Sequence, residues 1–148
     1  MDKEVLYQLC LDFIKQRIQT AETALAQARE ASNDDTKSSA GDKYETSREM
    51  MQQDIDRNKR LLMDAQENKK TLEAIGQAHP GDTVSGGSLV HTSEGSFYIS
   101  ISAGQLQSGN KTVFAISAAS PIGKLMLGKK KGDHFAFNGK KYLLNEVL

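Results

Sequence analysis

The chain lacks several residue types on which common protein classes depend. Its 148 residues include one cysteine and no tryptophan, which excludes a disulfide framework and a zinc site built from cysteines. Lysine plus arginine equals aspartate plus glutamate at 19 each, so there is no surplus positive charge for holding nucleic acid. No apolar run approaches the ~20 residues that a membrane span needs. The chain opens with charged residues and lacks the apolar segment of a signal peptide. We therefore expect a cytoplasmic protein that binds neither nucleic acid nor a membrane by itself.

Glycine and proline are nearly absent from the first half of the chain. Gly41 is the one glycine before residue 76, and the other glycines and both prolines come later. The first half thus has the composition of long helices, and the second half that of strands and turns. The cluster at 79–82 (His-Pro-Gly-Asp) is typical of a break between elements. The sequence predicts an α+β protein with a helical domain over 1–76 and a β domain over 80–148.

Apolar residues in the first half recur at heptad spacing, which predicts a coiled coil. The first seam comprises Tyr7, Leu11, Ile14, Ile18, Ala21, Leu25 and Ala28. The second comprises Tyr44, Met51, Ile55, Leu62, Ala65, Leu72 and Ile75, with Arg48, Asn58 and Lys69 as interruptions. A polar segment at 32–42 separates the two runs and is expected to be a loop, so the helices should form an antiparallel hairpin. Near the N-terminus the apolar face is widened by residues that we expect the β domain to cover: Leu6, Leu9, Cys10 and Phe13.

The second half alternates strand-like runs with turn residues. Strands are predicted at 88–91, 95–101, 111–116, 134–137 and 140–144. Asn138-Gly139, between the last two, is typical of a type I′ hairpin turn. A proline followed by apolar residues predicts one short helix within 120–127. We expect a small antiparallel sheet with a short helix.

Four acidic residues lie close together near the end of the predicted hairpin, a region that we call the tip (32–45). They are Asp34, Asp35, Asp42 and Glu45. Carboxylates exposed to solvent have pKa values near 4 and are ionised at pH 7, so they could bind a hard cation through oxygen. Alternatively, Asp34 and Asp35 cap or solubilise a loop, while Asp42 and Glu45 stabilise the start of the second helix. Spacing alone leaves both interpretations open.

The segment 120–133 carries a more specific pattern. It reads Ser120-Pro121-Ile122-Gly123, then Gly128-Lys129 and, three residues later, Gly132-Asp133. This closely resembles the C-terminal signature of the Gre transcript-cleavage factors. The order of parts, a helical hairpin followed by a small β domain, is also similar to that family.

The resemblance implies a partner and a mechanism. Gre factors bind bacterial RNA polymerase through a β domain of FKBP-like fold, while the coiled coil enters the secondary channel of the polymerase. The polymerase-binding residues would be Ser120, Pro121, Ile122, Gly123 and Lys124. Alternatively, Ser120, Pro121 and Ile122 only shape the turn into the short helix. The acids at the tip, Asp34, Asp35, Asp42 and Glu45, would assist cleavage of backtracked RNA. Asp34 and Asp35 would help to hold a second Mg²⁺, which is shared with the polymerase and not bound by the free protein.

On this interpretation the protein is an auxiliary factor and not an enzyme. It would act as a monomer and meet RNA only at the 3′ end inside the polymerase. Basic residues near the tip would face RNA or the channel wall, or would only balance the charge of the helices: Arg29, Lys37, Lys43 and Arg48.

The tip departs from the family pattern in one respect. Gre factors carry an Asp and a Glu three residues apart soon after the first helix, and here that spacing occurs at Asp42 and Glu45, beside Tyr44. An alternative is therefore a channel-binding regulator or inhibitor that does not stimulate cleavage. A peptidyl-prolyl isomerase-like folding helper is a third hypothesis, which an aromatic content of 6% disfavours.

Overall fold

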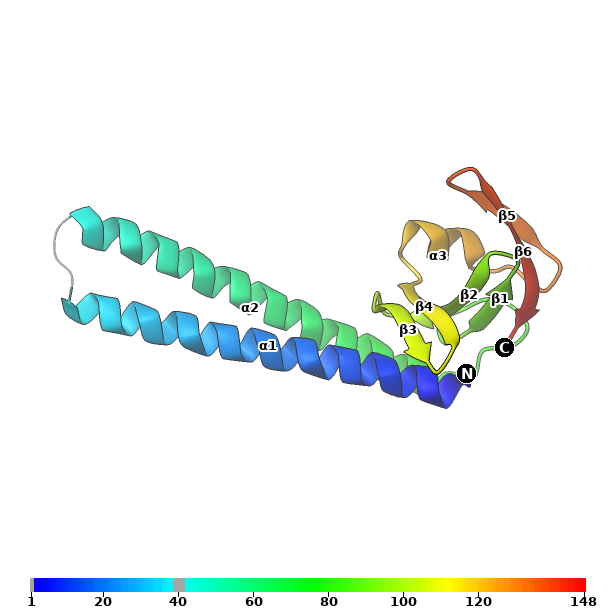
Figure 1. Ribbon diagram of the computed structural model, residues 1–148, viewed down its shortest axis with the longest axis horizontal. Coiled ribbons are helices and arrows are strands. Elements are labelled where there is room, and N and C mark those ends of the chain that lie inside the picture. The colour runs from blue at the N-terminus through cyan, green and yellow to red at the C-terminus, as the bar shows by residue number, and fades with distance from the viewer. Residues whose placement is uncertain (1, 39–41) are drawn as a thin grey trace. The chain divides into compact units, whose positions relative to one another are not determined.

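The computed structural model describes the backbone of residues 2–38 and 42–148 and the side chains of residues 2–33 and 46–148. Within these ranges the chain forms two long helices, followed by a six-stranded mixed sheet and a short helix (Figure 1). This confirms the α+β class. Contacts divide the chain into two compact units. The sheet unit comprises Met1–Phe13 and Lys69–Leu148, and the hairpin unit comprises Ile14–Asn68.

The boundary between the two compact units does not coincide with the change in glycine and proline content along the sequence. The first and last turns of the helical region belong to the sheet unit, because residues 1–13 and 69–76 make most of their contacts there. The expected domains, 1–76 and 80–148, instead followed the distribution of glycine and proline. A helix can extend through two units without a change in its own composition.

The helices α1 (Lys3–Ser38) and α2 (Asp42–Gly76) bury the predicted seams. On α1, Ile14, Ala21 and Leu25 are buried, and the other predicted positions of that seam are half-buried. On α2 the buried positions are Ile55, Ala65 and Leu72. Asn58 and Lys69, which interrupt the second seam, are half-buried at seam positions. The heptad pattern therefore predicted which faces of the helices are covered.

The prediction of a loop over 32–42 is wrong for residues 32–38 and 42, and residues 39–41 lie outside the described residues. The helical backbone of α1 continues to Ser38, and that of α2 begins at Asp42. Serine, asparagine, aspartate and threonine favour turns, but each costs less than about 0.7 kcal/mol in a helix relative to alanine. Extending an existing helix is much easier than starting one, so these residues did not end α1 where their preferences suggested.

Five of the six strands were expected from the sequence. They are β1 (Leu89–Thr92), β2 (Gly95–Ser100), β4 (Lys111–Ser117), β5 (His134–Phe137) and β6 (Lys140–Val147). The short helix α3 (Pro121–Met126) also lies where it was predicted. Asn138 and Gly139 have φ values of 52° and 78°, as a type I′ turn between β5 and β6 requires.

The sheet is mixed, so the prediction of an antiparallel sheet is wrong for one pair. The strand order is β3-β4-β2-β1-β6-β5, and β2 runs parallel to β4 with Phe97 opposite Phe114. The unpredicted strand β3 (Gly104–Ser108) causes this arrangement. It lies beyond β4 at the edge of the sheet, and the chain then turns back along β4 between β3 and β2.

The two faces of the sheet are covered by different parts of the sheet unit. One face contributes to a core cluster that includes Met126 of α3: Val84, Val90, Phe97, Ile99, Met126, Phe135 and Leu144. Because side chains alternate along a strand, Tyr98 and Ser100 point to the opposite face. There Cys10 Sγ lies 3.6 Å from Ser100 Oγ, and both residues are buried. The beginning of α1 therefore covers this face, which explains its widened apolar surface.

Neither long helix contains, within its described residues, an uninterrupted apolar stretch of the length and hydropathy needed to cross a bilayer.

Candidate functional sites

The segment Ser120–Lys124 forms the start of α3, and its conformation is held by the serine. Ser120 is the N-cap: its Oγ accepts a hydrogen bond from Gly123 N at 3.0 Å and donates one to Ser117 O at 2.7 Å. Pro121 follows at the first helical position, where its missing N–H is not needed. The Ser-Pro pair thus fixes where α3 begins and in which direction it leaves β4.

Gly123 is required by a close backbone approach. A Cβ atom built on Gly123 would overlap the carbonyl oxygen of Ser117 and lie 2.8 Å from Ser120 Oγ. Any side chain at this position would therefore displace the carbonyl that Ser120 binds. The backbone around α3 therefore requires glycine at position 123, whether or not the motif binds a partner.

The remaining residues of the motif differ in accessibility. Ile122 is half-buried and packs against the core cluster, whereas Pro121 and Lys124 are exposed. Leu125 and Leu127, which follow them, are 39% and 41% exposed. We call the exposed set, Pro121, Lys124, Leu125 and Leu127, the α3 surface.

The α3 surface combines apolar groups with a cation. Lys130 and Lys131, shortly after α3, are also exposed. A surface of this composition suits a protein partner with apolar and acidic side chains, since apolar contact area and opposite charge both favour association. Of the five residues predicted to bind polymerase, Pro121 and Lys124 are the two that are openly accessible to a partner.

The side chains of the four predicted tip acids lie outside the described residues. Asp34, Asp35, Asp42 and Glu45 therefore stay a prediction, as do Lys37 and Lys43. Among the neighbouring cations, Arg29 and Arg48 are exposed, on α1 and α2 respectively. Elsewhere in the described part of the chain, no three His, Cys, Asp or Glu side chains come together as a group able to hold a metal ion.

Four aromatic side chains of the sheet unit pack against one another: Phe97, Phe114, Phe135 and Tyr142. Phe135 and Tyr142 stack with ring centroids 4.8 Å apart, and Phe97 lies 6.2 Å from Tyr142 and 5.9 Å from Phe114. Phe97 and Phe135 are buried, whereas Phe114 is 40% exposed. These rings belong mainly to the core, and this arrangement gives no specific support to the isomerase hypothesis.

Two buried groups have perturbed acidity on the face that α1 covers. Burial raises the pKa of the Cys10 thiol, and the hydrogen bond to Ser100 partly opposes that shift. Burial also raises the pKa of Tyr98 to about 12, with smaller contributions from Cys10 and Tyr7. Both groups are therefore neutral at pH 7. Cys10 is a small buried residue on the apolar face that the β domain was expected to cover.

Comparison of the chain with models of protein families gave no match, and neither did comparison with curated proteins. The Gre resemblance thus depends on the motif at 120–133 and on the order of the parts.

Proposed function

We propose that this protein is a transcription elongation factor of the Gre type. Its helical hairpin enters the secondary channel of bacterial RNA polymerase, and acidic residues near the end of the hairpin assist cleavage of backtracked RNA. The cleaving activity belongs to the polymerase, and this chain supplies an auxiliary group. We further propose that the hairpin is a coiled coil and that the sheet unit has an FKBP-like fold.

The observation that carries the proposal is the two-helix construction of the hairpin unit. Helices of 36 and 35 residues correspond to about 50 Å each at ~1.5 Å per residue. Within the described residues of the hairpin unit, the buried apolar positions form one narrow seam, on which Ala21, Leu25 and Ile55 lie. A long two-helix element with a thin seam suits insertion into a channel, since it carries residues far along its axis without a bulky core.

The α3 surface supplies the second part of the proposal. Ser120 and Gly123 fix the geometry of α3 through the cap and the close approach to Ser117. Pro121 and Lys124 are then available to the polymerase on the exposed side. In this motif, Ser120 and Gly123 would shape the helix, and Pro121 and Lys124 would bind the polymerase.

The proposed chemistry is hydrolysis of a phosphodiester with two metal ions. When bound in the polymerase, the two ions would supply an activated water and stabilisation of the leaving oxygen. Carboxylates are the preferred ligands of Mg²⁺, which usually retains several waters and needs only one or two protein carboxylates. Asp34 and Asp35, or Asp42 and Glu45, would complete the coordination of an ion that the polymerase also holds.

The decisive experiment measures release of short 3′ RNA fragments from a stalled, backtracked elongation complex in Mg²⁺. We expect the protein to accelerate release at least about tenfold, which corresponds to about 1.4 kcal/mol of transition-state stabilisation. The paired variants D34A/D35A and D42A/E45A identify which acids act. Asp56→Ala is the matched control, because Asp56 is an exposed acid on α2 that lies 11 residues beyond Glu45.

The outcomes separate the hypotheses. Loss of stimulation in one paired variant, with polymerase binding retained and Asp56→Ala unaffected, would support the carboxylate mechanism. Full activity in both paired variants would contradict it. If the protein did not bind polymerase at all, the whole proposal would be wrong.

Docking is tested at Lys124 and not at Ile122. A charge at Ile122, which packs against the core, would destabilise the sheet unit as well as change the surface. Lys124 is exposed, so Lys124→Glu changes the charge of the surface without placing a charge in the core. We expect this variant to weaken polymerase binding, whereas Lys111→Glu, at an exposed position on β4, should have little effect.

One observation favours the alternative of a regulator without cleavage activity. The helical backbone of α1 extends to Ser38, so Asp34 and Asp35 belong to a helix and not to the loop that was predicted. A helical backbone has less freedom than a loop to adapt to a metal ion. Binding to polymerase with no accelerated cleavage would establish this alternative.

A further inference from the structure

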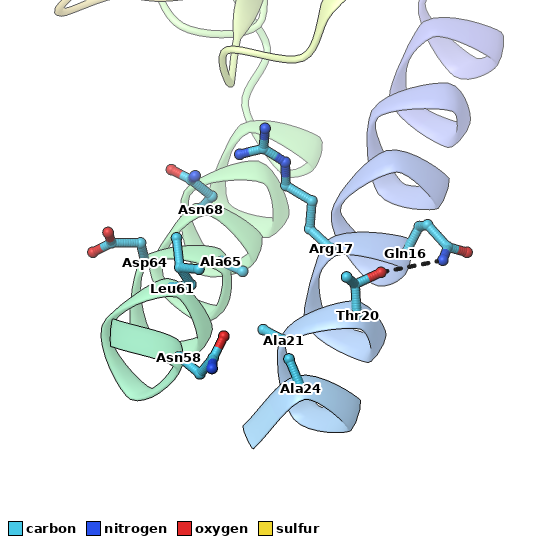
Figure 2. Close-up of a pocket in the computed structure, with 10 residues that line it drawn as sticks. All are labelled: Gln16, Arg17, Thr20, Ala21, Ala24, Asn58, Leu61, Asp64, Ala65 and Asn68. Carbon is cyan, nitrogen blue, oxygen red and sulfur yellow. Dashed lines mark hydrogen bonds between the residues drawn. The ribbon is translucent and has the colours of Figure 1, made fainter. Parts of the chain in front are cut away.

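A groove between α1 and α2 in the hairpin unit is bordered by polar side chains that already have partners. Its volume is about 390 Å³. Small residues line it on both helices: Ala21, Ala24 and Ala65 (Figure 2). Gln16 Nε2 donates to Thr20 Oγ1 at 3.4 Å, and Asn58 Nδ2 donates to the carbonyl oxygen of Asp54 at 2.9 Å. Because these bonds are made within the chain, they do not indicate a ligand for this groove.

A second cavity lies within the sheet unit. Its volume is about 540 Å³, which falls in the range of ~300–1,000 Å³ that is usual for small-molecule sites. Its walls come from the first turns of α1, from the end of α2 with the residues that follow it, and from the sheet region. We call it the α1–sheet cavity, and its lining includes Lys3, Glu4, Tyr7, Glu73, Gly76 and Tyr98.

Tyr98 brings to this cavity a hydroxyl that has no hydrogen-bond partner in the described part of the chain. The residue is 3% exposed, and no described residue forms a hydrogen bond with its hydroxyl. Buried hydroxyls nearly always have a partner, because an unpaired one loses its bonds to water without replacement. Tyr98 borders the α1–sheet cavity, so a molecule in that cavity can supply the missing bond.

Lys3 brings a second unpaired group to the same cavity. It is half-buried, and burial lowers the pKa of its ammonium. Among the described residues, no carboxylate forms an ion pair with it. An ammonium that is partly removed from water is stabilised by an anion that accepts its hydrogen bonds. Lys3 on α1 and Tyr98 on β2 thus offer two donors to one space.

Tyr7 forms a wall of the cavity against the last residue of α2. Gly76 has no side chain there, and a Cβ atom built on it would lie 2.7 Å from Tyr7 Cε2 and 3.1 Å from Tyr7 Oη. The ring of Tyr7 therefore lies against the backbone at the end of α2. Together with Ile75, which also lines the cavity, this ring provides an apolar surface beside the donors.

We propose that the α1–sheet cavity binds a small organic carboxylate with an apolar body. The carboxylate accepts hydrogen bonds from the Lys3 ammonium and the Tyr98 hydroxyl, and the apolar body contacts Tyr7. The ligand carries a single negative charge, because Glu4 and Glu73 also line the cavity and repel a dianion such as phosphate. The inference concerns the free protein and does not depend on the proposed role in transcription.

Titration of the full chain with benzoate, followed by NMR of the backbone amides, tests the proposal. We expect a Kd on the order of 1 mM for so small a ligand, so benzoate is varied from about 0.05 to 20 mM at constant ionic strength. The amide signals of residues around the cavity should shift and reach saturation. Benzamide, which lacks the charge, and inorganic phosphate should each bind at least about fivefold more weakly.

Tyr98→Phe removes the hydroxyl and leaves the ring. It should weaken benzoate binding at least about fivefold, since one hydrogen bond to a charged group is lost. The same variant should not lower the Tm of the free protein, because the hydroxyl has no partner in the chain to lose. Tyr142→Phe is the matched control, because Tyr142 is a half-buried tyrosine of β6 that does not line the cavity.

Lys3→Gln removes the positive charge and should weaken benzoate binding at least about tenfold. Lys15→Gln is its matched control, because Lys15 is exposed on the same helix and does not line the cavity. This pair gives an independent comparison if Tyr98→Phe does not fold.

Four results would overturn the proposal. Amide shifts that remain linear to the highest benzoate concentration would mean that the cavity holds only water. Equal affinities for benzoate and benzamide would exclude recognition of the charge. Equal effects within either pair of variants on benzoate binding would exclude the named donors. A lower Tm for free Tyr98→Phe than for free Tyr142→Phe would show that the chain already satisfies the Tyr98 hydroxyl.

Discussion

Replacement of Gly123 by alanine gives the sharpest test of the structure around α3. The added Cβ would overlap the carbonyl oxygen of Ser117, which accepts hydrogen bonds from Ser120 Oγ at 2.7 Å and from Ser120 N at 3.1 Å. Relief of the overlap requires the Ser117 carbonyl or the first turn of α3 to move. Either movement disturbs the cap that fixes where α3 begins.

The magnitude follows from three contributions. Overpacking costs about 1–3 kcal/mol, and two weakened hydrogen bonds cost about 1 kcal/mol each. Alanine regains about 1 kcal/mol because it favours the helix over glycine. The net loss in the free energy of unfolding is therefore about 2–4 kcal/mol, which corresponds to a fall in Tm of about 5–15 °C for a chain of this size.

The assay is urea and thermal unfolding followed by near-ultraviolet circular dichroism of the tyrosines, since the chain has no tryptophan. Gly81→Ala is the matched control, because no atom lies within 4 Å of its added Cβ and its φ is not positive. That variant should be neutral or stabilising by less than about 1 kcal/mol. If Gly123→Ala unfolded at the same temperature as Gly81→Ala, the proposed close approach of the two backbone segments would be refuted.

Three further predictions concern the sheet unit. Asn138→Val should destabilise it by about 1–2 kcal/mol in urea unfolding, because a β-branched residue does not tolerate a φ of 52°, and an unchanged midpoint would contradict the turn geometry. The pKa of Tyr98 is raised from 10.0 to about 12, so the folded state favours the neutral form of this tyrosine. Its contribution to the free energy of unfolding is complete below pH 10 and is lost as the pH rises towards 12. Absorbance at 295 nm should therefore show one tyrosine that ionises at higher pH than the others. Cys10 is fully buried and its pKa is raised. A disulfide reagent at pH 8 should therefore label it at least about 100-fold more slowly in native protein than in urea. Fast labelling of the native protein would show that the beginning of α1 does not cover the sheet.

Elements specified by neighbouring residues were predictable from the sequence. The heptad seams, the Asn138-Gly139 turn and the start of α3 each depend on a spacing or conformation that a few adjacent residues determine. The widened apolar face near Cys10 even predicted that the β domain covers the beginning of α1, because an apolar surface of that width needs more than one partner helix. For the candidate site, the motif at 120–124 was found from the sequence, since its residues are contiguous.

Other features depend on contacts between residues that are distant in the chain, and only the tertiary structure decided them. Strand β3 has a single buried residue, Leu106, and its position beyond β4 makes β2 and β4 parallel. Local alternation identifies a strand but not its neighbour. The need for glycine at position 123 arises from the carbonyl of Ser117, and the accessibility of Pro121 and Lys124 arises from the packing of Ile122. The groove at Ala21 and Ala65 likewise exists because α1 and α2 align two small residues across the hairpin. Composition and spacing therefore determined the elements, whereas packing determined which side chains of each element remain available to a partner.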